Sequence, residues 1–127
     1  MPTAPLAVVV EDDLFLSEIY ADALRSSGLQ VETFYEGQSA ITALKKMVPD
    51  LIVLDLNLPN YSGLEIFRDL RNNPATAETW VLIVTADPSQ AAELSQSEIE
   101  SQNLLVLSKP ISVDQLDQLA KRLAFQK

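Results

Sequence analysis

The sequence predicts an α/β fold in which helices cover both faces of a five-stranded, doubly wound parallel sheet. Two features of the 127-residue chain support this prediction. Short aliphatic runs alternate five times with segments whose apolar residues recur at helical spacing. The connections are too short for anything other than right-handed crossovers, so the strands are expected to be parallel. The expected strand order is 2-1-3-4-5.

The strands are predicted from short apolar runs. LAVVV and LIVLDL are nearly continuous in valine, leucine and isoleucine, which is typical of strands buried on both faces. LQVETFY is more polar and indicates an edge strand. WVLIVTA and LLVLS complete the set. The five predicted strands span residues 6–10, 29–35, 51–56, 80–86 and 104–108.

A segment with helical periodicity follows each strand. Gly28 is expected to end the first helix, and the second ends before Pro49. The third is expected to end near Asn72-Asn73-Pro74, and the fourth is polar and weakly patterned. Four of the predicted helices span residues 13–27, 37–48, 88–99 and 112–125, and residues 64–70 begin the third.

The composition indicates one globular domain and excludes several kinds of chemistry. Acidic residues interrupt every apolar stretch well before the roughly 20 residues of a membrane helix. The amino-terminal segment lacks the basic region of a secretory signal, so a cytoplasmic protein is expected. The net charge of −9 argues against direct binding of nucleic acid. The absence of cysteine and histidine excludes thiolate metal sites and histidine-dependent nucleophiles.

Polar residues gather where the predicted strands end. In a doubly wound sheet, ligands bind outside the carboxyl ends of the strands, so these residues are expected to lie close together. Asp55 is the least ordinary of them, because it closes a continuous apolar strand. The residues at the strand ends are Glu11, Asp12, Asp13, Asp55, Asn57, Thr85, Ser108, Lys109 and Pro110.

Each of these residues alone has an ordinary explanation. Asp13 is expected to cap the helix that follows it, Thr85 suits a strand, and Lys109 suits a solvated loop. Together they are harder to explain, because two carboxylates about 4 Å apart repel by roughly 4 kcal/mol at an effective dielectric constant of 20. Ligands that are all oxygens favour Mg²⁺ or a similar hard ion. A metal ion, a carboxylate nucleophile and a lysine together indicate phosphoryl transfer.

Four motifs resemble the receiver domain of bacterial two-component response regulators, which has a flavodoxin-like fold. They are VVVEDD at 8–13, LIVLDLNLPNYSG at 51–63, VTA at 84–86 and SKP at 108–110, each at the end of its own strand. The resemblance covers essentially the whole chain. It implies a single receiver domain over residues 1–127, with no effector domain in this chain.

The resemblance implies a role for each site residue. Asp55 would accept a phosphoryl group from a histidine kinase or a histidine phosphotransfer protein. Thr85 would form a hydrogen bond with a phosphoryl oxygen, and Lys109 would pair with the phosphoryl group. The Lys109-Pro110 bond is expected to be cis. The family usually has tyrosine or phenylalanine three residues before the lysine, where this chain has Val106.

The resemblance also implies a Mg²⁺ site. Asp12 and Asp55 would bind the ion through their carboxylates, Glu11 would act largely through water, and Asn57 would contribute its backbone carbonyl. Gly63 would support the turn into the third helix.

The resemblance further implies a signalling domain rather than an enzyme. Its output would be a downstream protein or a removed effector domain, and phosphorylation-dependent homodimerisation remains open. Leu14 and Phe15 fall off the core face of the first helix. They are either isolated exposed apolar residues or a docking patch for a kinase or phosphotransfer helix.

Three other functions are compatible with the fold. A pseudo-receiver is an interaction module of the same fold that is never phosphorylated. The intact acidic pair, together with Asp55, Thr85 and Lys109, argues against it. A haloacid-dehalogenase-like aspartyl phosphatase needs an Asp-x-Asp motif on its first strand, whereas this chain has Asp55-Leu56-Asn57 on the third. In a flavodoxin-like cofactor binder, the three acids after the first strand would repel a phosphate.

Overall fold

The main sheet has five parallel strands in the order β2-β1-β3-β6-β7. The computed structural model describes residues 4–100 and 103–125. Because β4 and β5 form a separate two-stranded sheet, β6 and β7 are the fourth and fifth strands of the main sheet. The observed order therefore corresponds to 2-1-3-4-5 and confirms the predicted doubly wound fold. The strands are β1 (Leu6–Val10), β2 (Gln30–Phe34), β3 (Leu51–Leu54), β6 (Trp80–Thr85) and β7 (Leu104–Ser108).

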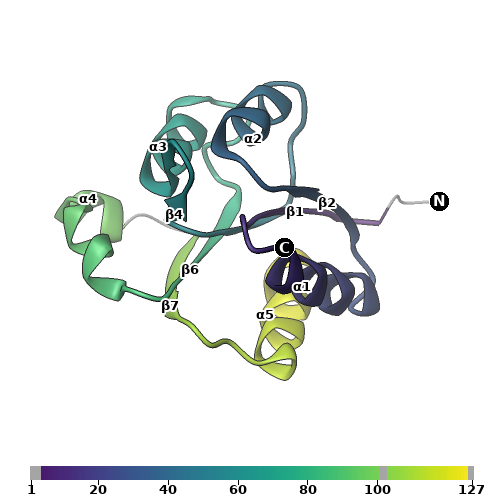
Figure 1. Cartoon of the computed structure of the whole chain (residues 1–127). Coiled ribbons are helices and arrows are strands. Elements are labelled where there is room, and N and C mark those ends of the chain that lie inside the picture. The colour runs from purple at the N-terminus through teal and green to yellow at the C-terminus, as the bar shows by residue number, and fades with distance from the viewer. Residues whose placement is uncertain (1–3, 101–102, 126–127) are drawn as a thin grey trace.

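Helices cover both faces of this sheet. In Figure 1, α1 (Leu14–Ser26) and α5 (Val113–Phe125) lie on one face, while α2 (Gly37–Leu44) and α3 (Gly63–Asn72) lie on the other. Alternating strand residues divide the core between the two layers. Val9 belongs to the α1 and α5 layer, whereas Val8 belongs to the opposite layer. None of the described helices is long and apolar enough to cross a membrane.

The predicted fourth helix, residues 88–99, is wrong as a single element. The chain instead forms a 3-10 helix, η1 (Pro88–Glu93), and a short helix, α4 (Gln96–Ile99). Ser95 begins the second piece with a capping box, in which its hydroxyl accepts from the Glu98 N–H at 3.2 Å and the Glu98 carboxylate accepts from the Ser95 N–H at 2.8 Å. Arg68 Nε of α3 also donates a hydrogen bond to Glu98 Oε2 at 2.9 Å.

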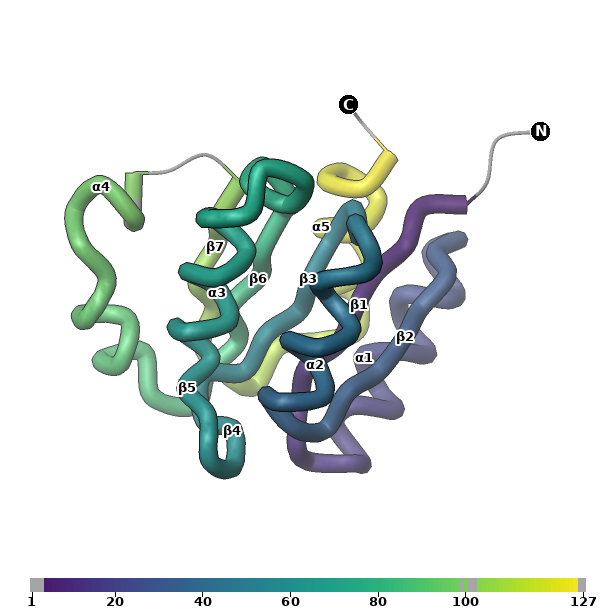
Figure 2. The backbone as a smooth tube through the Cα atoms, turned by 90° about the horizontal axis from the view of Figure 1, so that it is seen from above, coloured from purple at the N-terminus to yellow at the C-terminus, as the bar shows by residue number. Residues whose placement is uncertain are grey.

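The segment expected as a loop after the third strand contains a small hairpin. Its strands β4 (Asn57–Leu58) and β5 (Tyr61–Ser62) are antiparallel, and Asn60 between them has a φ of 60°. Figure 2 shows this hairpin projecting from the end at which α3 begins. The second helix also ends four residues earlier than residue 48. The chain tightens after this helix, because the Lys46 N–H donates to the Ala43 carbonyl. Val48 precedes Pro49, and a residue before proline avoids helical geometry.

Gly63 fits the turn into α3 because the backbone of the preceding strand runs against it. Its N–H donates to the Leu56 carbonyl at 3.0 Å. A Cβ atom at this position would lie 2.3 Å from the Asp55 carbonyl oxygen and 2.7 Å from the Leu56 Cα. The approach therefore fixes α3 directly beneath the segment that carries Asp55.

We expect Gly63→Ala to lower the free energy of unfolding by about 1–3 kcal/mol, because the added methyl overlaps backbone atoms that cannot move aside independently. Chemical denaturation monitored by circular dichroism measures this change. Alanine otherwise stabilises a helix relative to glycine. An equally or more stable variant would therefore contradict the close approach.

Candidate functional site

The carboxyl ends of β1, β3, β6 and β7 bring the predicted site residues together. Asp55 and Lys109 lie just beyond their strands, yet their backbones remain hydrogen-bonded to neighbouring strands. The Asp55 N–H donates to the Val10 carbonyl at 3.0 Å, and the Lys109 N–H donates to the Thr85 carbonyl at 2.8 Å. The main-chain positions of these residues are therefore fixed by the sheet rather than by flexible loops.

Three carboxylates, those of Glu11, Asp12 and Asp55, form what we call the acid cluster. Each offers an oxygen that lies within 4.8 Å of the others. Glu11 and Asp55 are 2% and 5% exposed, while Asp12 faces solvent. The Lys109 Nζ atom lies 2.7 Å from Glu11 Oε1 and 3.3 Å from Asp55 Oδ2. One ammonium thus bridges two buried carboxylates.

The electrostatics of the acid cluster show that this single ammonium is not enough to neutralise it. The pKa of Glu11 is raised to about 7, chiefly by burial and also by the charge of Asp55, against the hydrogen bonds from Lys109 and the Asp13 N–H, which lower it. For Lys109, burial lowers the pKa, but Glu11 and Asp55 outweigh burial and hold it above its ordinary value. The site retains excess negative charge that a cation can offset.

The loops around the acid cluster hold the remaining predicted residues. The Asn57 N–H donates to Asp55 Oδ1 at 3.1 Å. The Thr85 side chain is fully buried, and its hydroxyl bonds the backbone of Asp87, accepting from the N–H at 3.1 Å and donating to the carbonyl at 3.3 Å. Asp13 caps α1 as predicted, accepting from the Leu16 N–H at 3.1 Å.

Two further expectations from the sequence are met. The Lys109-Pro110 peptide bond is cis. Leu14 and Phe15 are 61% and 74% exposed at the start of α1, directly after the acidic residues. Val106 lies on the edge strand β7, opposite Ile83 of β6, and is partly exposed.

Sequence reasoning missed Gln90, a residue of η1 that reaches the site. Its Nε2 donates to Asn57 Oδ1 at 2.8 Å across 33 positions of sequence. Because a glutamine in a polar segment is unremarkable, only the fold reveals this contact.

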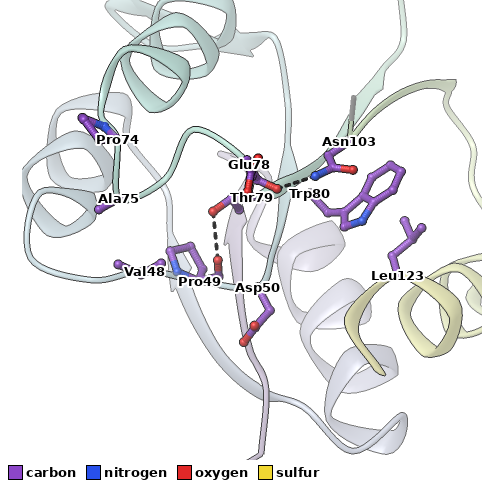
Figure 3. Close-up of a pocket in the computed structure, with 10 residues that line it drawn as sticks. All are labelled: Val48, Pro49, Asp50, Pro74, Ala75, Glu78, Thr79, Trp80, Asn103 and Leu123. Carbon is purple, nitrogen blue, oxygen red and sulfur yellow. Dashed lines mark hydrogen bonds between the residues drawn. The ribbon is translucent and has the colours of Figure 1, made fainter. Parts of the chain in front are cut away.

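A pocket at the opposite end of the sheet contains none of the predicted site residues. Figure 3 shows it between the chain segments that enter β3, β6 and β7, with a volume of about 440 Å³. Its polar groups already bond backbone atoms: Thr79 Oγ1 donates to the Pro49 carbonyl at 3.0 Å, and Asn103 Nδ2 donates to the Glu78 carbonyl at 2.6 Å. The acid cluster therefore remains the better candidate site.

We expect Lys109→Met to lower the free energy of unfolding by about 3–5 kcal/mol at pH 8 without added metal, because it leaves two buried carboxylates without their counter-charge. Urea denaturation measures the loss. Lys121→Met is the matched control, since Lys121 is an exposed lysine that pairs with Asp117 at 3.1 Å on α5. The control should lose less than about 1 kcal/mol. Equal effects would contradict a special role for Lys109.

The raised pKa of Glu11 predicts that the metal-free protein loses stability as pH rises. The ordinary pKa of 4.5 applies to the unfolded chain and about 7 to the folded one, so between these values the folded state holds the extra proton. The free energy of unfolding contributed by this group should therefore fall from about pH 4.5 to pH 7. Denaturation at several pH values measures the slope. Glu11→Gln should flatten it, and an unchanged slope would contradict this assignment.

Comparisons with known proteins agree with this geometry. Residues 7–121 match the family model of the response regulator receiver domain. The phosphate regulon transcriptional regulatory protein PhoB of Rhizobium meliloti is 32% identical over 112 residues, which cover 88% of this chain and 48% of that protein. The chain thus spans about half the length of this relative.

Solved structures show the same fold. A CheY-like response regulator receiver domain from Methylobacillus flagellatus has a TM-score of 0.79 at 26% identity, covering 95% of this chain and 99% of the other. The receiver domain of a sensor histidine kinase from Pseudomonas aeruginosa, solved with magnesium in its active-site cleft, has a TM-score of 0.82 at 22% identity and covers 98% and 100%. The chain belongs to the family of response regulator receiver domains, the signalling modules of two-component systems.

Proposed function

We propose that this receiver domain accepts a phosphoryl group on Asp55 and thereby switches the binding of a partner. The observation that carries the proposal is the buried Asp55 carboxylate, held at the carboxyl edge of the sheet with Lys109 Nζ 3.3 Å away. A histidine kinase or a histidine phosphotransfer protein would be the donor. The sequence contains no histidine, so the phosphohistidine must belong to another protein or to a part of the protein outside this sequence.

The donor atoms of the acid cluster fit Mg²⁺. All three are carboxylate oxygens within 4.8 Å of one another, and hard cations prefer such ligands. Three carboxylates at −1 each and one lysine at +1 leave a formal charge of −2 when all are ionised. We assign Asp12 and Asp55 as carboxylate ligands, Glu11 as a ligand acting largely through water, and Asn57 as a backbone carbonyl ligand. When bound, Mg²⁺ supplies positive charge beside the phosphoryl oxygens.

The transfer uses groups whose positions the sheet already fixes. An Asp55 oxygen attacks the phosphorus of the donor phosphohistidine, the new O–P bond forms, and the P–N bond breaks with the imidazole as leaving group. Lys109 pairs with the transferred phosphoryl group. The Thr85 hydroxyl has one hydrogen, so it can donate to a phosphoryl oxygen only by giving up the bond that it donates to the Asp87 carbonyl. Its turn toward Asp55 would then move the segment that leads into η1.

Two exposed apolar residues at the start of α1 lie where a phosphoryl donor would dock. Leu14 and Phe15 stand exposed beside the acidic edge, where a donor helix would contact them while reaching Asp55. We propose that residues 1–127 form one receiver domain acting in the cytoplasm, on a separate partner or on an effector domain. Val106 replaces a large switch aromatic, so the output would depend less on ring rotation at β7.

A pseudo-receiver is the nearest competing function. It would use the same fold for binding without phosphorylation and would not require Lys109 to bridge Glu11 and Asp55. An aspartyl phosphatase of the haloacid-dehalogenase class would turn over a phosphomonoester repeatedly, whereas a receiver retains one phosphoryl group.

We expect acetyl phosphate with Mg²⁺ to add one phosphoryl group to the chain, detected by intact mass spectrometry. Asp55→Asn should abolish the addition, because an amide is not a nucleophile. Asp69→Asn, at an exposed position of α3, is the matched control and should be phosphorylated normally.

Two outcomes would contradict the proposal. Phosphorylation of the Asp55→Asn variant would place the phosphoacceptor elsewhere. An unmodified wild-type chain that also gives no adduct with beryllofluoride would support the pseudo-receiver instead.

A further inference from the structure

We propose that Gln90 is a positioning residue that holds the Asn57 side chain away from Asp55 and so lengthens the lifetime of the aspartyl phosphate. This inference rests on the proposed function of Asp55. It extends that function from accepting the phosphoryl group to controlling its loss. Gln90 belongs to η1, which supplies no member of the acid cluster but contacts Asn57 through this side chain.

Asn57 is held from two sides. Its backbone N–H donates to Asp55 Oδ1 at 3.1 Å, which fixes the main chain beside the phosphoacceptor. Its side-chain Oδ1 accepts from Gln90 Nε2 at 2.8 Å, which draws the carboxamide toward η1. Both residues line a hollow of about 310 Å³ that also includes Tyr61 and Glu93 but not Asp55. The Asn57 side chain therefore faces the gap between hairpin and η1.

The other end of the Gln90 amide supports a role beyond packing. Its Oε1 atom is buried and has no hydrogen-bond donor among the described residues. A buried carbonyl oxygen without a donor destabilises a fold, so an apolar side chain of the same size would pack here at least as well. The bond to Asn57 is thus the feature that explains an amide at this position.

The chemistry connects this bond to the phosphoryl lifetime. In hydrolysis, a water oxygen attacks the phosphorus opposite Asp55. The P–O bond to Asp55 breaks, and the products are the free carboxylate and inorganic phosphate, which takes up the proton of the water. An acceptor beside the phosphorus would orient that water by accepting its hydrogen.

Asn57, which bonds Asp55, and Asp87, which bonds Thr85, carry such acceptors, and residues of η1 donate hydrogen bonds to both side chains. Asn57 Oδ1 accepts from Gln90, while Asp87 Oδ1 accepts from the N–H of Ser89 at 3.1 Å and from its hydroxyl. Withdrawing these oxygens leaves the attacking water less well oriented. We infer that η1 protects the phosphoryl group and that Gln90 exerts its share of this effect through Asn57.

The experiment measures decay of the phosphorylated protein in Mg²⁺ after the phosphodonor has been removed. Gln90→Met keeps the length of the side chain but removes its donor, and we expect hydrolysis to become about 2- to 10-fold faster. The thermal unfolding midpoint should stay the same or rise, because the unpartnered buried oxygen is gone. Gln118→Met, at an exposed position of α5, is the matched control and should decay as the wild type does.

The role of Asn57 is tested in a second background. In Asn57→Ala, the further change Gln90→Met should have no effect on decay, since the group that Gln90 positions is absent. A readout independent of phosphorylation comes from NMR of the metal-free protein. There, the Gln90 side-chain amide protons should exchange more slowly than those of Gln118, and Asn57→Ala should remove the difference.

The outcomes separate this inference from the proposed function. Normal phosphorylation with unchanged or slower decay in Gln90→Met would overturn the inference alone. An equal acceleration in the Asn57→Ala background would also overturn it, because the effect would then be structural. A wild-type chain that takes no phosphoryl group would overturn the proposed function and this inference together.

Discussion

The salt bridge from Lys109 to Glu11 and Asp55 is the interaction on which the rest of the site depends. Both carboxylates are almost fully buried, and an isolated buried charge costs several kcal/mol. The parallel sheet makes the pairing possible because β1, β3 and β7 end at one edge. Hydrogen bonds between backbones then hold Asp55 and Lys109 in place beyond the strand ends. The fold brings these charges together while leaving them incompletely neutralised.

The site has a rigid part, which is held by the backbone of the sheet, and a movable part, which is held by side-chain hydrogen bonds. The backbones of Asp55 and Lys109 are fixed by the sheet. The Thr85 side chain is instead held by hydrogen bonds to Asp87, and the Asn57 side chain by one from Gln90. Such bonds each contribute little net stability, so they can be exchanged when charge at Asp55 changes. The segment from Asp87 through η1 to α4 would therefore move when these hydrogen bonds are exchanged. Arg68 of α3 anchors the far end of this segment through its hydrogen bond to Glu98 of α4.

Much of this arrangement could be predicted from the sequence, and the exceptions have physical causes. Continuous apolar runs such as residues 51–54 specify buried strands, and their alternation with helices specifies a parallel sheet. The break within residues 88–99 was missed although Ser95 and Glu98 have capping-box spacing, because the polar segment suggested one helix. The contact between Gln90 and Asn57 had no signal in the sequence, since it depends on how η1 and the hairpin meet in space.

The most direct test of the central claim is a crystal structure of the chain with Mg²⁺ and beryllofluoride, an analogue of the aspartyl phosphate. We expect beryllium to be bonded to an Asp55 oxygen and Mg²⁺ to be held by Asp12, Asp55 and the Asn57 carbonyl. Lys109 Nζ should lie within hydrogen-bond distance of a fluoride, and the Thr85 hydroxyl should have turned from Asp87 to a fluoride. Beryllium on another carboxylate, or a site in which Lys109 still bridges Glu11 and Asp55 with no ligand bound, would contradict the account.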